Sequence, residues 1–109
     1  IRFIFSFIIL FFMPVYILAT KLQNPDLVEK RKEQGEKFLR LVREKVPDIK
    51  WIGHYAILGR YDFIDIFEVK NEKEAAKVSL LSRSSGATFA ESWTAIPYAG
   101  FLELVEDLK

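Results

Sequence analysis

The chain has 109 residues, half of them hydrophobic, and its 16 basic and 15 acidic side chains leave a net charge of +1. This length suits one domain with a real core. Acids and bases are interleaved, which argues against nucleic-acid binding, because phosphate neutralisation needs clustered Lys and Arg. Cysteine is absent and only one histidine is present, so disulfides, thiolate nucleophiles and multi-histidine centres are excluded within one chain. We therefore expect no metal and no cofactor, and the composition is compatible with a cytoplasmic location.

The first twelve residues, IRFIFSFIILFF, are strongly apolar and have three open interpretations. They are an upstream extension, a membrane or signal segment, or an added helix or strand. Residues 1–19 have about the length of a bilayer span, and Arg2 ahead of an apolar run is typical of a signal peptide. Insertion or cleavage would remove the first expected strand. We therefore assign the twelve residues to an extension outside a domain of residues 13–109, and expect no membrane association unless residues 1–19 insert.

Beyond this extension, the pattern predicts alternating strands and helices. Asn24 suits the N-cap of a helix that begins at Pro25, and Pro47 ends this helix. Asn71 suits the N-cap of a second helix, and Gly86 suits the position beyond its end. The predicted strands are residues 15–21, 50–58, 61–69 and 87–95, and the predicted helices are residues 25–46, 72–82 and 98–108.

The order of these elements, β-α-β-β-α-β, predicts an α+β, ferredoxin-like antiparallel sheet with two helices on one face. A sheet with one wet face should alternate between apolar and polar residues, yet both parities of the hairpin strands are apolar. One parity holds Ile52, Ala56, Phe63 and Phe67, and the other holds Ile57, Ile64 and Ile66. A second copy of the chain is the expected cover, which predicts a homodimer or a higher oligomer.

A hairpin around Gly59 and Arg60 places His54 directly opposite Asp65. A carboxylate beside an imidazole orients the ring and stabilises its protonated form, as in many acid-base sites. In a dimer whose two sheets pack face to face as a barrel, we expect the pair on the interior face. Tyr61, Phe63, Phe67, Ile52 and Ala56 are expected on the same face. A structural or half-exposed pair remains the alternative, because perturbed pairs also occur at structural sites and the topology places His54 on an edge strand.

Further candidates lie in the last strand and in the turn. Glu91 shares the parity of Trp93, so it would bind a polar ligand group inside the barrel or form an intersubunit salt bridge. Asp62 beside the turn is expected to accept backbone N–H groups, a common role of Asp in turns.

The run Gly59, Arg60, Tyr61, Asp62, followed by Glu68, resembles the signature of the GYD family, and AESWTA resembles the last strand of that family. The resemblance covers Met13 to about Leu104 and implies a dimeric α/β barrel. The chain departs from the family at Lys70-Asn71-Glu72 and at Ser84-Ser85-Gly86, which weakens any transfer of ligand contacts. The hairpin also resembles the effector-binding module of leucine-responsive regulators, which oligomerises and binds amino acids between subunits.

Two classes of function stay open. The first is an oligomeric protein that binds a small molecule in an apolar cleft between subunits, through Tyr61, Phe63, Glu91 and Trp93. The second is a cofactor-independent enzyme, similar to small monooxygenases or isomerases of related folds, with His54 and Asp65 as catalytic residues. Fold analogy alone suggests this second class.

Overall fold

The computed structural model describes residues 13–22 and 28–109, so the extension of residues 1–12 and the expected cap at Asn24 lie outside the described residues. The described strands are β1 (Val15–Leu22), β2 (Lys50–Ala56), β3 (Phe63–Glu68) and β4 (Ala87–Ala95). The described helices are α2 (Val28–Lys45), α3 (Glu72–Ser84) and α4 (Tyr98–Asp107). These elements follow the predicted order.

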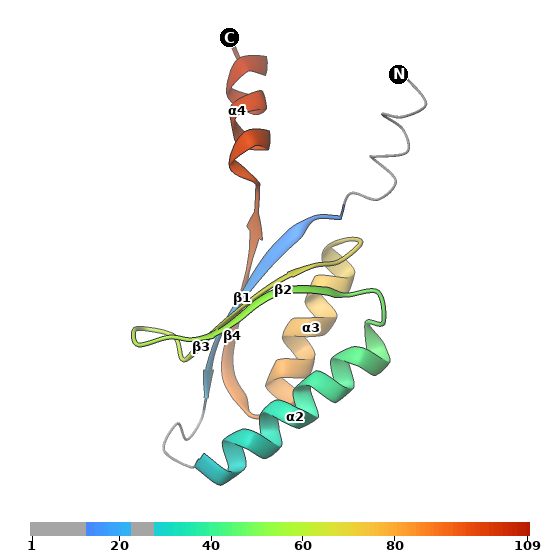
Figure 1. Ribbon diagram of the computed structural model, residues 1–109, viewed down its shortest axis with the longest axis vertical. Helices are drawn as coiled ribbons and strands as arrows, with labels where there is room; N and C mark the ends of the chain where they lie inside the picture. Colours follow the sequence, from blue (N-terminus) through green and yellow to red (C-terminus); the bar gives the residue numbers. More distant parts are fainter. Residues whose placement is uncertain (1–12, 23–27) are drawn as a thin grey trace.

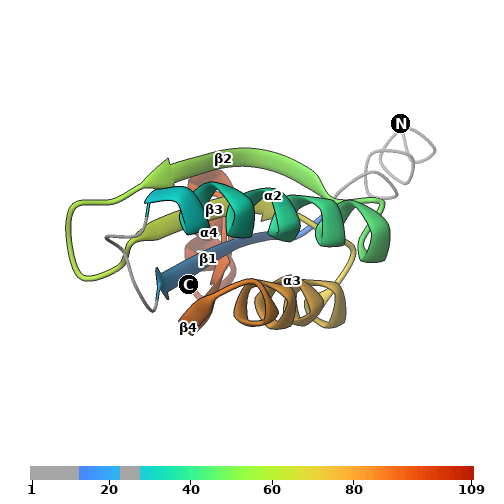
Figure 2. The ribbon, with the colours of Figure 1, turned by 90° about the horizontal axis from the view of Figure 1, so that it is seen from below.

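The four strands form one antiparallel sheet in the order β2-β3-β1-β4. Figures 1 and 2 show α2 and α3 on the same side of this sheet, while α4 projects beyond its end. The α+β, ferredoxin-like fold that the sequence predicts is therefore confirmed. The predicted edge position of the second strand is also confirmed.

The ends of α3 follow the sequence signals. The Asn71 side chain accepts a hydrogen bond from the backbone N–H of Glu74 at 3.1 Å, which is the N-cap contact that the sequence predicts. The helix ends at Ser84, and Gly86 then adopts a φ of 113°. Such a positive φ is accessible to glycine without a steric penalty, so the chain turns here into β4.

The core lies between the sheet and the two helices. Phe38 and Val42 of α2, together with Val46 directly after the helix, recur at helical spacing and belong to the same buried cluster as Leu18 and Phe67 of the sheet. Leu18 and Phe67 are fully buried, so the middle of the sheet is anchored by side chains from its two central strands. The other members of this core cluster are Tyr16, Val69, Ala75, Val78 and Ala90.

A β-bulge interrupts the pairing of β2 with β3. Trp51 pairs with Phe67, but Gly53 already pairs with Ile66, so Ile52 is an extra residue without an opposite partner. The predicted parity of Ile52 is therefore wrong: Trp51 takes the core side, with its ring 5.7 Å from that of Phe67, and Ile52 is half exposed.

The hairpin turn is longer than the sequence predicts. The backbone N–H of Ile57 donates to the Asp62 carbonyl at 2.9 Å, and residues 58–61 form the turn. The backbone N–H of Asp62 instead donates to the carbonyl of Thr20 at 2.8 Å, which ties the chain to β1 just before β3 begins. At the turn, β2 therefore ends at Ala56 and β3 begins at Phe63, so both strands are shorter there than the predicted strands 50–58 and 61–69.

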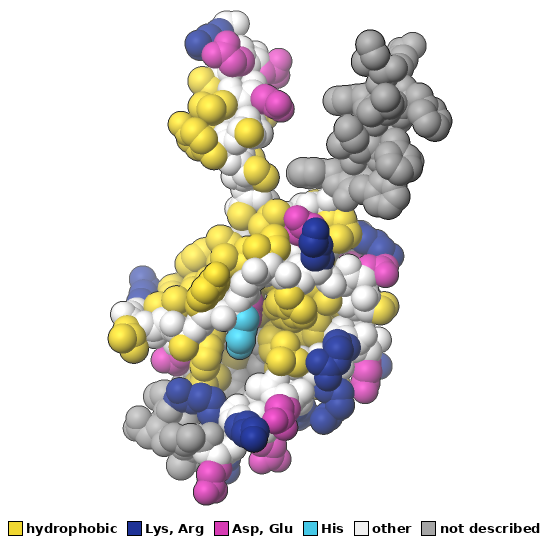
Figure 3. Space-filling model, in the orientation of Figure 1, with side chains coloured by type: hydrophobic (Ala, Val, Ile, Leu, Met, Phe, Trp, Pro, Cys, Tyr) yellow, Lys and Arg dark blue, Asp and Glu magenta, His cyan; other side chains and the backbone are white. Residues whose placement is uncertain are grey.

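The sheet face away from α2 and α3, called here the open face, carries large apolar side chains. Tyr55, Phe89 and Trp93 on this face are 56%, 46% and 38% exposed. Helix α4 has no buried residue, and Figure 3 shows hydrophobic side chains along one of its sides. Its exposed large apolar residues are Tyr98, Phe101, Leu102, Leu104 and Val105, and Leu108 follows directly after the helix. Within residues 13–22 and 28–109, no helix combines the length and the apolar character that a membrane crossing requires.

Candidate functional site

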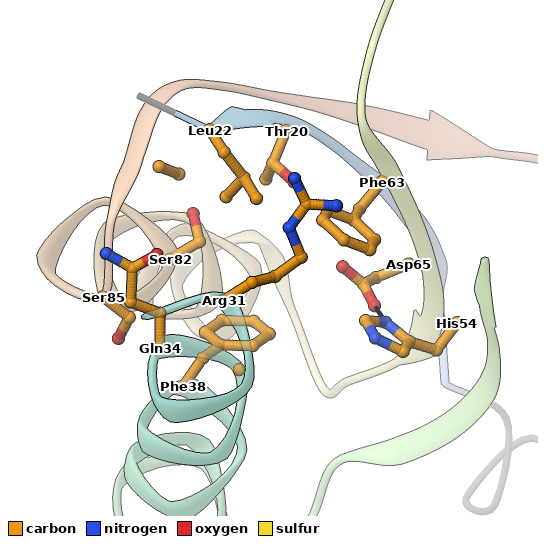
Figure 4. Close-up of a pocket in the computed structure, with 12 residues that line it drawn as sticks. Thr20, Leu22, Arg31, Gln34, Phe38, His54, Phe63, Asp65, Ser82 and Ser85 are labelled. Atoms are coloured by element: carbon orange, nitrogen blue, oxygen red, sulfur yellow. Dashed lines mark hydrogen bonds and ion pairs between the residues drawn. The ribbon is translucent and has the colours of Figure 1, made fainter. Parts of the chain in front are cut away.

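A cavity of about 80 Å³ opens on the helix side of the sheet, and we call it the helix-side cavity. It lies where the first turns of α2 meet the end of α3 and the strands β1, β2 and β3. Figure 3 shows the single histidine of the chain beside this hollow, and Figure 4 shows the side chains that surround it. The lining residues are Thr20, Leu22, Arg31, Gln34, Gly35, Phe38, His54, Phe63, Asp65, Ser82, Ser85 and Ala87.

His54 and Asp65 face each other across β2 and β3, as the hairpin register predicts. The Nδ1–H of His54 donates a hydrogen bond to Oδ1 of Asp65. Asp65 is only 2% exposed, whereas the side chain of His54 is 54% exposed, so the imidazole shields a buried carboxylate. Burial raises the pKa of Asp65 above its ordinary value of 3.8, and the hydrogen bond from His54 acts in the opposite direction.

Phe63 connects this pair to a third polar group. Its ring stacks on the imidazole of His54, with the ring centroids 5.8 Å apart and the planes at 2°. The guanidinium of Arg31 lies over the same ring, 5.9 Å from the centroid. The Nε atom of Arg31 is buried and has no hydrogen-bond partner among the described residues. The cavity therefore combines a buried carboxylate, an imidazole and a guanidinium around one aromatic ring.

Arg31 is a cavity residue that was not predicted from the sequence. Arg31 lies seven residues before Phe38 and eleven before Val42, so it continues the inward stripe of α2 toward the N-terminus. A charged residue on an otherwise apolar helix stripe was the signal that could have identified it.

The open face carries a second cluster, which is separate from the helix-side cavity. The hydroxyl of Tyr61 donates a hydrogen bond to Oε2 of Glu91. The ring of Tyr61 stacks on that of Phe89, with the ring centroids 6.2 Å apart, and packs edge-to-face with Trp93, with the centroids 5.8 Å apart. The hydrogen bond to Glu91 raises the pKa of Tyr61 above 10.0, and the bond from Tyr61 lowers the pKa of Glu91 below 4.5.

The structure thus divides the predicted site residues between the two sides of the sheet. His54, Phe63 and Asp65 line the helix-side cavity, whereas Tyr61, Glu91 and Trp93 gather on the open face. The expectation that Tyr61 shares a face with His54 and Asp65 is wrong, as is the expectation that the pair faces the barrel interior. Tyr61 belongs to the turn and no longer follows the alternation of the strand, and Asp65 has the parity of the buried Phe67.

The prediction that Asp62 accepts a backbone N–H group is confirmed. Its Oδ2 accepts a hydrogen bond from the N–H of Leu22 at 2.8 Å, and this N–H belongs to β1 rather than to the turn. In the described part of the chain, no group of three or more His, Asp or Glu side chains is arranged to hold a metal ion.

Comparison with known proteins agrees with this architecture. The chain has the class of fold in which a four-stranded antiparallel sheet carries two helices on one face. The family model of the GYD domain matches residues 16–105, and the chain belongs to this family.

One relative is the "glutamine synthetase and cystathionine beta-lyase binding protein" of Thermus thermophilus, which is 28% identical over 99 residues, covering 89% of this chain and all of that protein. The crystal structure of MtbAldR matches 81% of this chain with 13% identity and a TM-score of 0.56, and this chain spans 56% of its length. A dimeric ferredoxin-like protein of unknown function from Thermobifida fusca matches 78% of this chain and 92% of its own, with 13% identity and a TM-score of 0.51. The two structural likenesses establish the fold alone.

Proposed function

We propose that this protein is a homo-oligomeric binding protein in which two copies pack through the open faces of their sheets. The observation that carries the proposal is the large exposed apolar area of the open face, where Tyr55, Phe89 and Trp93 are each more than a third exposed. An apolar sheet face needs a cover, and a closed two-fold pairing is the commonest one. The description of the Thermobifida protein of the same fold as dimeric supports a second copy as this cover.

In this proposal, a small molecule binds in the cleft between the subunits, at the cluster of Tyr61, Glu91 and Trp93. The aromatic rings would supply an apolar contact surface, and the carboxylate of Glu91 would accept a hydrogen bond. The name of the Thermus relative says that it binds two enzymes, which supports a binding function for this family and leaves the small-molecule ligand to be tested. A cytoplasmic location is part of the proposal, because the chain contains no cysteine for disulfide formation.

Sedimentation of the purified chain tests the pairing. Trp93→Glu places a charge on the open face and should shift the protein from dimer to monomer at micromolar concentration. Leu80→Glu is the matched control, because Leu80 is 63% exposed on α3, outside the open face, and this variant should remain dimeric. A parent protein that sediments as a monomer would remove the argument, and so would equal association of the two variants.

Native mass spectrometry of the dimer tests the ligand. A small molecule that copurifies with the parent should be lost from Tyr61→Phe and Glu91→Gln while both variants remain dimeric. Retention of the same mass in both variants would show that the ligand lies elsewhere.

One observation favours a second candidate, a cofactor-independent enzyme that uses His54 and Asp65. The hydrogen-bonded pair lines a cavity, and the imidazole is half exposed, so it is accessible to a substrate proton. His54→Gln would preserve most of the packing and abolish the turnover of a copurified molecule that the parent protein carries out. Unchanged turnover in His54→Gln would reject this candidate.

A further inference from the structure

The polar groups of the helix-side cavity present complementary hydrogen-bonding requirements. Arg31 brings a buried Nε–H that finds no acceptor among the described residues. Asp65 uses Oδ1 for the bond from His54, and Figure 4 shows its second oxygen directed into the cavity, on the side of the Arg31 side chain. The cavity therefore offers an ionic donor and an ionic acceptor to one occupant.

The walls between these groups are mostly apolar. Phe63 lies beside both Arg31 and His54. Leu22, Phe38 and Ala87 add further apolar lining, next to the polar side chains of Thr20 and Gln34. The cavity volume of about 80 Å³ exceeds the roughly 10–15 Å³ that one water molecule requires when cavity volume is measured in the same way. An occupant of a few non-hydrogen atoms with one short apolar group fits such a space.

The two serines of the lining do not donate a hydrogen bond to Asp65. Ser82 Oγ donates to the carbonyl of Ser79 at 2.6 Å, and Ser85 Oγ donates to that of Leu81 at 2.8 Å. Both hydroxyl hydrogens are used within α3 and its cap, so they do not satisfy Asp65. An occupant that carries a hydrogen-bond donor can therefore reach the second oxygen of Asp65 without displacing either serine bond.

We propose that the helix-side cavity binds a short carboxylate with a hydroxyl group on the adjacent carbon. The carboxylate accepts hydrogen bonds from the guanidinium of Arg31, the hydroxyl donates to the second oxygen of Asp65, and the alkyl group contacts the ring of Phe63. The hydroxyl is essential, because an unsubstituted carboxylate would bring its charge near Asp65 without compensation. Binding at this site requires neither the dimer nor turnover, so its test is independent of the tests of both proposed functions.

Titration calorimetry on the full chain tests the chemistry, with lactate as the probe. Lactate should bind saturably, whereas propionate, which lacks the hydroxyl, and 2-propanol, which lacks the carboxylate, should each bind at least about tenfold more weakly. Arg31→Gln should lose at least about tenfold in lactate affinity. Lys32→Gln is the matched control, because it removes the same charge from an exposed neighbour on α2 and should bind lactate as the parent does.

Equal lactate affinity of Arg31→Gln and Lys32→Gln would overturn the proposal, as would equal affinity of the parent for lactate and propionate, or no saturable binding of lactate. Chemical-shift mapping on the parent keeps the test independent of the folding of the variants. Lactate should shift the signals of Arg31, His54 and Phe63 and leave that of Trp93 on the open face unchanged; the reverse pattern would also overturn the proposal.

Discussion

The carboxylate of Asp62 accepts a hydrogen bond from the backbone N–H of Leu22 at 2.8 Å. This contact joins the end of the hairpin turn to the end of β1, 40 residues away in the sequence. A second bond at the same place, from the Asp62 N–H to the Thr20 carbonyl at 2.8 Å, strengthens the junction. The turn is thereby fixed relative to β1, and Tyr61 is directed toward the open face.

Asp62→Ala should lower the free energy of unfolding by about 1–3 kcal/mol, because the partly buried N–H of Leu22 loses a charged acceptor. Urea denaturation measures this difference. Asp62→Asn keeps an acceptor oxygen of the same reach and should lose less than the alanine variant. An Asp62→Ala variant as stable as the parent would show that the side-chain hydrogen bond does not contribute to stability.

The burial of Asp65 predicts a specific pH dependence of stability. Because burial raises the folded-state pKa above the ordinary value of 3.8, the folded protein retains a proton that the unfolded chain releases. The stabilisation from this group is therefore complete below pH 3.8 and is lost as the pH rises through the folded-state pKa. Asp65→Asn cannot titrate, so its stability relative to the parent should increase with pH across this window. A pH-independent difference between the two proteins would contradict the prediction.

The partner of Asp65 should modulate that profile. His54→Ala removes the hydrogen bond that lowers the pKa of Asp65, so the loss of stability should extend to higher pH than in the parent. At neutral pH this variant should also be about 1–3 kcal/mol less stable, because a buried carboxylate oxygen is left without a donor. His54→Gln retains a donor and should lose less. Thermal melts at a series of pH values measure both effects.

Two glycines near the helix-side cavity should respond to alanine with opposite signs. Gly86→Ala forces a side chain onto a backbone with φ of 113° and should destabilise the fold by about 1–3 kcal/mol, even if the nearby Gln34 side chain moves aside. Gly35→Ala occupies open space within α2 and should stabilise it by about 0.5–1 kcal/mol. Chemical denaturation of the two variants measures both changes in the free energy of unfolding. Equal destabilisation of Gly86→Ala and Gly35→Ala would refute the explanation from backbone conformation.

A chain that starts at Met13 should fold and remain soluble, because all the core residues of the described fold lie beyond this position. Its circular dichroism should show the same helices and sheet, with one cooperative melting transition. An insoluble truncated protein, together with a full chain that partitions into detergent, would instead assign residues 1–19 to a membrane segment.

The sequence was sufficient for the order of the elements, for the caps at Asn71 and Gly86 and for the facing pair of His54 and Asp65, because these features depend on local backbone preferences and on strand register. It was insufficient for the side of the sheet on which the pair lies. That outcome depends on which parity the helices cover, and the hairpin strands are apolar on both. Tyr61 was misassigned because the bonds of Asp62 to β1 are long-range contacts that the local pattern does not contain.

The irregularity at Ile52 also restricts how copies of the chain can associate. β2 is an edge strand, and a regular edge presents a continuous row of backbone donors and acceptors to any extended chain that approaches. The extra residue between Trp51 and Gly53 breaks this row and locally increases the twist of the strand, so a neighbouring strand cannot stay in register along it. The bulge thus disfavours open-ended growth of the sheet into fibres along the β2 edge, whereas packing through the open face does not require this edge to be regular.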